Sequence, residues 1–397
     1  MTTYQAHGNL PAKCHTQLWR DERLLVEEMV GLEGFDGPST ILYHLHAPMR
    51  LKRVGGFRPI IREPWLPEVH VHRRFDTWDR QPEGDALSSR RLLAWNQDVE
   101  IWLARPDQAM EHFYRDGEGD ELVFVHEGSG VVETILGELP YRPGDYVVLP
   151  RGVTYRFCPA GVEPQRYLVV TTPGLIEIPE RYRSRYGQLL EHAPYHHRDM
   201  HGPARLVTHD ESGEFLVTVR VRDGMQDYVV PTHPFDVVGW DGYLYPFTLN
   251  VGDLEPITKQ VHAPPPIHQT FAGRDFMLCT FCPRPLDWHP DAVPIPYSHA
   301  NLNSEELIYY VSGDFGSRRG VDHGSMTLHP SGLTHGPQPG VAEASLGTTH
   351  TDELAVMIDT FRPLRLTVLA RELDNPGYAW SWSDEGVPMA QSLPSVP

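Results

Sequence analysis

The sequence lacks any run of about 18 consecutive apolar residues, the length that a membrane-spanning helix needs. It is also poor in positive charge, because 34 Lys and Arg residues stand against 53 Asp and Glu residues, for a net charge of −19. Proteins that bind nucleic acids need a basic face for the phosphates, so this balance argues against that class. The N-terminal residues show no apolar stretch after basic residues, so we expect no secretory signal. We therefore predict a protein that handles small molecules, with neither a membrane nor a nucleic acid as its partner.

Cysteine is scarce as well, with four residues in the chain, which is too few for a disulfide framework. Cys279 and Cys282 have CxxC spacing, but no second pair is present to complete a zinc site. They fall in residues 275–282, which have the pattern of a buried strand, where positions three apart face opposite sides. We interpret them as structural thiols and expect a reducing, cytoplasmic compartment.

Helical patterns are few, and residues 16–32 and 179–190 are the better candidates. Turn-forming residues are abundant instead, with 37 Pro and 34 Gly spread along the chain. Short apolar runs recur at a spacing of about ten residues, as in residues 123–125, 131–135 and 145–149. This alternation of short strands and turns predicts an all-β sandwich or barrel.

Two parts of the sequence resemble each other. Residues 120–128 (DELVFVHEG) match residues 305–313 (EELIYYVSG). Further on, residues 149–155 (LPRGVTY) match residues 329–335 (HPSGLTH). Paired similarities in the same order predict a duplicated β unit.

The repeat also predicts the domain organisation. The two copies are expected near residues 95–170 and 285–365. We expect an N-terminal β domain over residues 1–220 and a C-terminal domain over residues 221–397, each with one β barrel.

The second copy carries two motifs that predict chemistry. His299, Glu306 and Gly313 resemble the first signature motif of the cupin superfamily, which reads HxH, three or four residues, E, six residues and G. Asn301 stands where the second His of that motif would be. Residues 330–335 (PSGLTH) resemble the second motif, PxGxxH. The resemblance implies a duplicated cupin fold, in which each barrel is a jelly roll, with a metal in the second barrel.

The implied metal ligands are His299, Glu306 and His335. Two imidazoles and one carboxylate form a facial triad that suits non-heme Fe(II) and leaves positions open for a substrate and O₂. Glu305 is the alternative to Glu306, and the seven-residue step to Gly313 favours Glu306.

The first copy departs from this pattern. Tyr114 takes the place of His299, and Tyr155 takes the place of His335. Glu121 is kept, but it has no imidazole partners at the matching positions. We expect the first barrel to bind no iron and to serve as a structural half.

A narrower resemblance follows from residues 294–299 (PIPYSH), 313–315 (GDF) and 329–337 (HPSGLTHGP). These segments are similar to those of the homogentisate 1,2-dioxygenase family. That family has an N-terminal β domain and a C-terminal cupin-like iron domain, and it assembles as trimers and hexamers. The resemblance implies a homo-oligomeric enzyme that cleaves the ring of homogentisate (2,5-dihydroxyphenylacetate), a small aromatic acid, with O₂ to give maleylacetoacetate. A metal-dependent cupin of another class, such as an isomerase or a dioxygenase for a different hydroxylated aromatic acid, is the alternative.

The same resemblance implies further site residues. His268 matches a His that assists deprotonation of the substrate, and His262 is the alternative. Tyr297 and Phe315 match residues of the substrate pocket, with Phe315 where the family has a tyrosine. His329 is expected either to contact the substrate, to orient a ligand, or to be a packed core residue.

Overall fold

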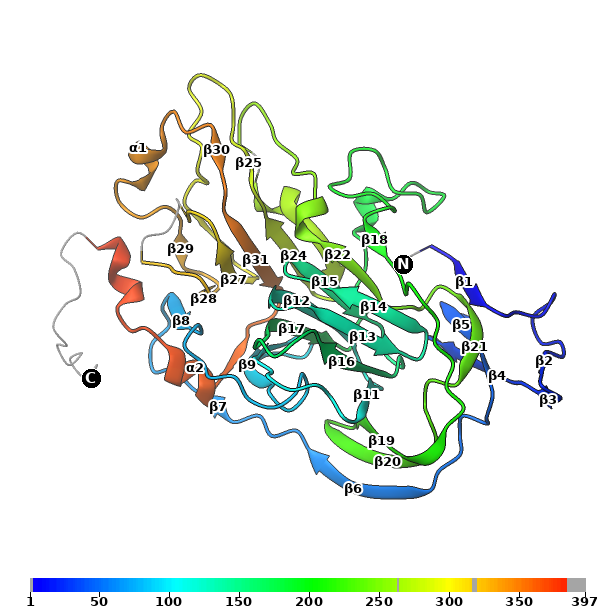
Figure 1. Ribbon diagram of the computed structural model, residues 1–397. Coiled ribbons are helices and arrows are strands. Elements are labelled where there is room, and N and C mark those ends of the chain that lie inside the picture. The colour runs from blue at the N-terminus through cyan, green and yellow to red at the C-terminus, as the bar shows by residue number, and fades with distance from the viewer. Residues whose placement is uncertain (1–2, 263, 316–319, 384–397) are drawn as a thin grey trace. The chain divides into compact units, whose positions relative to one another are not determined.

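The computed structural model describes residues 3–262, 264–315 and 320–383, and strands form nearly all of its regular structure (Figure 1). The helices in these residues are α1 (Val341–Ser345), α2 (Val368–Leu373) and the 3₁₀ segments η1 (Glu180–Tyr182), η2 (Val251–Asp253), η3 (Pro265–His268) and η4 (Tyr378–Trp382). None of the helices in the described ranges has the length and apolar character needed to cross a membrane. The predicted all-β fold class is confirmed.

The chain divides into two compact units. The first contains the residues up to Glu63, together with Gln81–Leu93 and Asp98–Leu254. The second contains Pro64–Arg80, Ala94–Gln97 and the residues from Glu255 onward. The expected division into domains at residues 220 and 221 stays a prediction. In the structure this position lies inside strand β19 (Ser212–Val221), which pairs with β20 (Gly224–Thr232) along most of its length.

Two large sheets form the jelly roll of the first unit. One runs in the order β18-β22-β15-β12-β17-β10, with bounds Met200–His201, Phe247–Asn250, Asp145–Leu149, Asp120–Glu127, Arg166–Thr172 and Glu100–Ala104. The other runs β14-β13-β16-β11-β19-β20-β6, where the remaining bounds are Gly137–Tyr141, Gly130–Thr134, Tyr155–Pro159, Phe113–Asp116 and Arg53–Pro59. Figure 1 shows β6, β19 and β20 running side by side. Buried side chains from both sheets, including Val123, Val147, Val132 and Phe157, make one core cluster.

The segment expected to form a helix at residues 16–32 forms strands instead. It contains β2 (Trp19–Arg20), β3 (Arg23–Leu24) and β4 (Val26–Gly31), and β4 joins the sheet β1-β21-β5-β4. The other strands of that sheet are β1 (Gln5–Gly8), β21 (Val237–Gly242) and β5 (Ser39–His44). Asp21 and Glu22 have φ values of +48° and +62°, which a right-handed helix cannot accommodate and a tight hairpin requires. The second helix prediction is also wrong, because residues 179–190 contain only the short segment η1.

The second unit contains the sheet β23-β24-β31-β27-β28-β8. Its bounds are Gln269–Gly273, Phe276–Phe281, Leu354–Thr360, Glu305–Ser312, Ser325–His329 and Arg73–Asp76. Shorter pairs are β26 (His299–Ala300) with β29 (Thr334–His335), β25 (Arg284–Pro285) with β30 (His350–Thr351), and β32 (Arg365–Thr367) with β7 (Pro64–Trp65). The end of β9 (Arg91–Trp95) also pairs with β32. Cys279 packs in the core cluster with Ile308, Tyr310 and Met357, and Cys282 is buried, as expected of structural thiols.

The strand registers confirm the duplication. In the first unit Tyr114 of β11 lies opposite Tyr155 of β16, and Glu121 lies opposite Leu149. In the second unit His299 lies opposite His335, and Glu306 lies opposite His329. The positions matched in the sequence therefore have equivalent places in the two barrels.

The motif glycines have matching backbone conformations as well. Gly128 and Gly313, which follow the two copies of the motif strand, have φ values of +94° and +91°. A Cβ atom on Gly313 would lie 2.2 Å from the carbonyl oxygen of Asp352, so a side chain is excluded there by space as well as by φ.

Candidate metal centre

Two histidines face each other across a short strand pair. His299 begins β26 and His335 ends β29, and the two residues are direct antiparallel partners. Directly opposite residues place their side chains on the same face of the sheet. Their ring centroids are accordingly 4.3 Å apart.

Glu306 supplies a carboxylate to the same place from β27. Its Oε2 lies 3.9 Å from Nε2 of His299, and its Oε1 lies 3.6 Å from Nε2 of His335. The ligand atoms of these three residues all lie within 4.8 Å of one another. The structure thus brings together the three residues that the sequence motifs selected.

The carboxylate of Glu306 is ionised although it is buried. Burial raises the pKa of this group, but the nearby imidazoles of His299, His329 and His335 outweigh burial and hold the pKa well below its usual value. A buried negative charge surrounded by imidazoles is the environment that a bound cation needs.

Backbone carbonyls orient both imidazoles. Nδ1 of His299 lies 3.2 Å from the carbonyl oxygen of Tyr297, and Nδ1 of His335 lies 3.3 Å from that of Leu333. A carbonyl only accepts, so each Nδ1–H donates and each Nε2 keeps its lone pair for the centre. Among the described residues, the buried Nε2 of His335 has no hydrogen-bond partner. These donor atoms fit a divalent metal ion, and the mixture of imidazole and carboxylate fits Fe(II).

Glu305 points elsewhere. One of its carboxylate oxygens accepts a hydrogen bond of 2.7 Å from the backbone N–H of Leu364. Neighbouring residues of a strand face opposite sides, so Glu305 and Glu306 cannot both reach the centre. Of the two candidates, the structure places Glu306 beside the histidines.

His329 lies directly behind the three candidate ligands. Its Nδ1 is 2.7 Å from Oε1 of Glu306, and its ring stacks on that of His335 at 4.4 Å. Its Nε2 lies 3.2 Å from the hydroxyl of Tyr378. His329 is fully buried and positions the carboxylate, which corresponds to the orienting role among the predicted alternatives.

A pocket opens beside the centre and contains His299 and Glu306 in its lining. It encloses about 1620 Å³ of space not occupied by atoms, part of it open to solvent. Its apolar wall is formed by residues of strands, of loops and of α1, namely Phe281, Ile295, Pro296, Ile308, Val341 and Met357. Arg284 contributes a positive charge, and Glu353 holds its guanidinium at 2.8 Å.

His268 lies in an adjoining pocket. That pocket also contains His262, and it shares Phe281 and Arg284 with the pocket at the candidate centre. Burial and the charge of Arg284 lower the pKa of His268 to about 3, so its imidazole is neutral near pH 7. The neutral ring can accept a hydrogen bond, and the predicted role of His268 in deprotonating the substrate stays a prediction.

Tyr297 and Phe315, the two residues matched to the substrate pocket, lie in different surroundings. Tyr297 is 63% exposed, with its ring 4.5 Å from that of His262. Phe315 packs against Tyr310 at 4.9 Å in the core cluster. Neither is among the described residues that line the pocket at the candidate centre, and their substrate contacts stay predictions.

Two residues near the candidate centre, His72 and Asp359, were not predicted from the sequence to lie there. The ring of His72 lies 5.4 Å from that of His329 and 5.7 Å from that of His335. Asp359 is the strand partner of Glu306, and its pKa is raised well above the usual range by burial and by the charge of Glu306. The alternation of two histidines at positions 70 and 72 was the only sequence signal for His72, and Asp359 had none.

The equivalent place in the first barrel is filled by an arginine. The guanidinium of Arg90 donates to Glu121 and, at 3.0 Å, to the hydroxyl of Tyr155, which also donates to Glu121. The guanidinium carbon lies 5.6 Å from the ring centroid of Tyr114. The side chain of Arg90 thus supplies the positive charge beside the buried carboxylate of Glu121. At a cupin metal site, a metal ion would supply that charge.

Comparisons with known proteins agree with this geometry. A family model described as "Homogentisate 1,2-dioxygenase N-terminal" matches residues 91–251. A protein of Saccharolobus solfataricus named "putative dioxygenase" is 41% identical over 385 residues, which cover 96% of this chain and 99% of that protein. The chain belongs to the homogentisate 1,2-dioxygenase family.

The comparisons also find more distant similarities. A homogentisate 1,2-dioxygenase of Rhizobium meliloti (strain 1021) is 25% identical over 417 residues, covering 94% of this chain and 88% of that protein. Among solved structures, protein Ylba from E. coli aligns with 76% of this chain and 94% of its own, at 8% identity and a TM-score of 0.36. The family model and the Saccharolobus relative, together with the clustered ligand atoms, make the chain a dioxygenase-family protein with a candidate metal centre in its second barrel.

Proposed function

We propose that the protein is an Fe(II)-dependent dioxygenase that cleaves the aromatic ring of homogentisate, or of a close analogue, with O₂ to give maleylacetoacetate. The observation that carries the proposal is the convergence of His299, Glu306 and His335 beside a pocket with apolar walls. Family membership supports the class of reaction.

The candidate ligands account for the metal requirement. Fe(II) held by these residues would supply a Lewis acid with coordination positions open to a hydroxylated aromatic acid and to O₂. Glu306 would offset part of the charge of such an ion, and His329 fixes the orientation of that carboxylate. The carbonyls of Tyr297 and Leu333 keep the two imidazoles in the tautomer that can bind a metal.

The pocket accounts for the substrate class. Phe281, Ile308 and Met357 offer apolar surface to an aromatic ring. Arg284 offers a guanidinium to the substrate carboxylate, and its pair with Glu353 holds it in place. His268, as a neutral imidazole in the adjoining pocket, offers a nitrogen lone pair that can accept a hydrogen bond from a phenol hydroxyl.

The test is oxygen consumption by the full chain loaded with Fe(II) under anaerobic conditions and then mixed with homogentisate and O₂. We expect uptake of one O₂ per ring opened and absorbance from the ring-opened product. His335→Ala is expected to lose both iron and activity, whereas His289→Ala, at a histidine of the same unit outside the candidate ligands, keeps both. Retention of iron by His335→Ala, or O₂-independent turnover with Zn(II) or Mn(II), would contradict the proposal.

The oligomeric state belongs to the same proposal. By analogy with the family we propose a homo-oligomer, either a trimer or a hexamer. Light scattering coupled to size-exclusion chromatography tests this, and a monomer at micromolar concentration would contradict it.

A further inference from the structure

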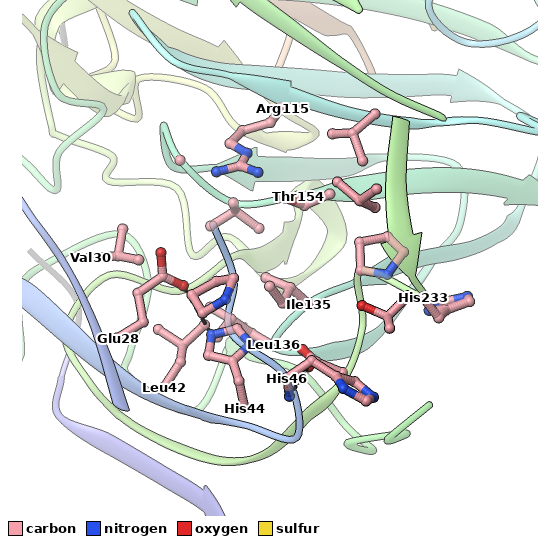
Figure 2. A pocket seen from close by; sticks show the side chains of 18 of the residues that line it. Glu28, Val30, Leu42, His44, His46, Arg115, Ile135, Leu136, Thr154 and His233 are labelled. Atoms are coloured by element: carbon pink, nitrogen blue, oxygen red, sulfur yellow. Dashed lines mark hydrogen bonds and ion pairs between the residues drawn. The ribbon is translucent and has the colours of Figure 1, made fainter. Parts of the chain in front are cut away.

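A second pocket lies entirely within the residues of the first unit. It encloses about 830 Å³ of space not occupied by atoms, part of it open to solvent. Most of its wall is apolar, with Val30, Leu42, Ile135, Val153 and Leu244 among the lining residues. Figure 2 shows the side chains that surround this space. The pocket shares no residue with the candidate metal centre.

One charged side chain in this pocket has no partner. Arg115 comes from β11 and is mostly buried, and the described residues give it neither a hydrogen bond nor an ion pair. Figure 2 shows its guanidinium directed toward the side of the pocket where Glu28 and Val30 lie. Burial lowers the pKa of Arg115 in spite of the attraction of Glu28, yet an arginine stays charged. A buried, unpaired guanidinium is costly unless something binds it.

The acidic groups of the pocket are already engaged. His44 lies between two carboxylates, with Nδ1 2.7 Å from Asp236 and Nε2 2.9 Å from Glu28. Burial lowers the pKa of His44, but these two hydrogen bonds outweigh burial and raise the pKa to about 9. The imidazolium therefore offsets one of the two carboxylates, and no carboxylate lies within ion-pair distance of Arg115 among the described residues.

The other basic groups of the lining are paired, neutral or at the surface. His233 is buried and accepts a hydrogen bond from the backbone N–H of Phe235, and burial lowers its pKa to about 4, so its imidazole is neutral. Arg151 donates to Asp120 at 3.1 Å, and His46 lies 2.7 Å from Asp210. Arg50 is exposed. Arg115 is thus the buried basic side chain of this pocket that is available to a ligand.

We infer that this pocket binds a small organic carboxylate with an apolar body, and that Arg115 receives its carboxylate. The planar guanidinium can form two parallel hydrogen bonds to a carboxylate. A spherical or fully hydrated anion cannot form this pair of bonds and also contact the apolar wall. The aliphatic wall takes the body of the ligand. This site is separate from the proposed reaction and does not depend on iron.

The test uses the full chain and benzoate as the probe, measured by calorimetry and by the shift of the melting temperature. Benzamide has the same shape without the charge, and inorganic phosphate has charge without an apolar body. We expect saturable binding of benzoate, with benzamide and phosphate weaker by about tenfold or more. Arg115→Met is expected to lose benzoate binding, while its melting temperature without ligand stays equal to or above that of the wild type. Arg50→Met is the matched control and is expected to bind benzoate as the wild type does.

Several outcomes overturn the inference. These are the absence of saturable benzoate binding to the wild type, equal binding by Arg115→Met, loss of binding in Arg50→Met, and phosphate binding as tight as that of benzoate. If Arg115→Met fails to fold, Arg115 has a structural role and Arg115→Lys decides. The lysine keeps the charge but loses the two parallel bonds, so it is expected to bind benzoate more weakly, and equal binding would refute the assignment.

Discussion

Replacing Arg90 by Met is expected to destabilise the first barrel strongly. The side chain of Arg90 is 8% exposed and that of Glu121 is 1% exposed, so the substitution leaves a carboxylate in the core without its cation. Loss of one member of a buried pair costs about 3–5 kcal/mol. Tyr155 still donates a hydrogen bond to Glu121, so the lower end of that range, about 3 kcal/mol, is expected.

The assay is urea unfolding, followed by hydrogen exchange in β12, which contains Glu121. With a urea dependence of about 3 kcal/mol per molar, the midpoint should fall by about 1 M. The neighbouring pair of Arg91 and Glu83 is the control, because its side chains are 42% and 43% exposed. Arg91→Met should cost no more than about 1 kcal/mol.

A double variant separates charge from packing. Arg90→Met combined with Glu121→Leu removes both charges and should recover most of the lost stability, because well-packed apolar residues can replace a buried pair at little cost. If Arg90→Met alone costs less than about 1 kcal/mol, or if the double variant is no better than the single one, Arg90 does not balance a buried carboxylate and the reasoning is wrong.

Three further predictions concern the other ionisable groups. Glu306→Gln should reduce iron content by more than about tenfold, whereas Glu305→Gln should keep it, as measured by metal analysis after dialysis; loss in both variants would contradict the assignment. His268→Asn should retain iron but slow O₂ consumption by about 10²-fold or more, and loss of iron would show that His268 supports the ligands instead. Because the pKa of His44 is raised from an ordinary 6.5 to about 9, its contribution to stability should be full below about pH 6.5 and disappear as the pH rises through 9. That contribution is on the order of 3 kcal/mol. Urea titrations of the wild type and His44→Gln between pH 6 and 10 should therefore converge at the alkaline end. A constant difference between the two across this range would show that His44 is not charged in the folded protein.

The repeat and the grouping of the three candidate ligands could be predicted because both follow from short segments, the repeat from matched spacing and the candidate ligands from their resemblance to the two cupin motifs. The step from Glu306 to Gly313 and the PxGxxH turn fix a strand, a turn and a strand end, and strand parity then selects which side chains face inward. The same spacing located Tyr114 and Tyr155 at the equivalent places of the first barrel. What the motif could not supply was the cation, because Arg90 reaches Glu121 from a segment that no motif connects to it.

Tertiary contacts overruled the local signals elsewhere. Residues 16–32 have a helical apolar spacing, but the turn at Asp21 and Glu22 and the pairing of β4 with β5 make them strands. The family resemblance matched Phe315 to the substrate pocket, and in the structure its ring packs against Tyr310 in the core cluster, so its substrate contact stays a prediction. Local patterns cannot distinguish a residue that faces a pocket from one that faces the core, since both are enclosed by the barrel.

The strand β8 sets a limit on how this protein can be divided. It lies early in the sequence, and its partner β28 follows near the end of the chain. During synthesis on the ribosome, β8 therefore waits for its partner until most of the first unit has been made. A fragment that begins at residue 255 would lack β8 and would leave β28 as an open edge, ready to pair with other chains and aggregate. Isolating the barrel that contains the candidate metal centre thus requires residues 64–80 to be joined to it, for instance by a circularly permuted gene.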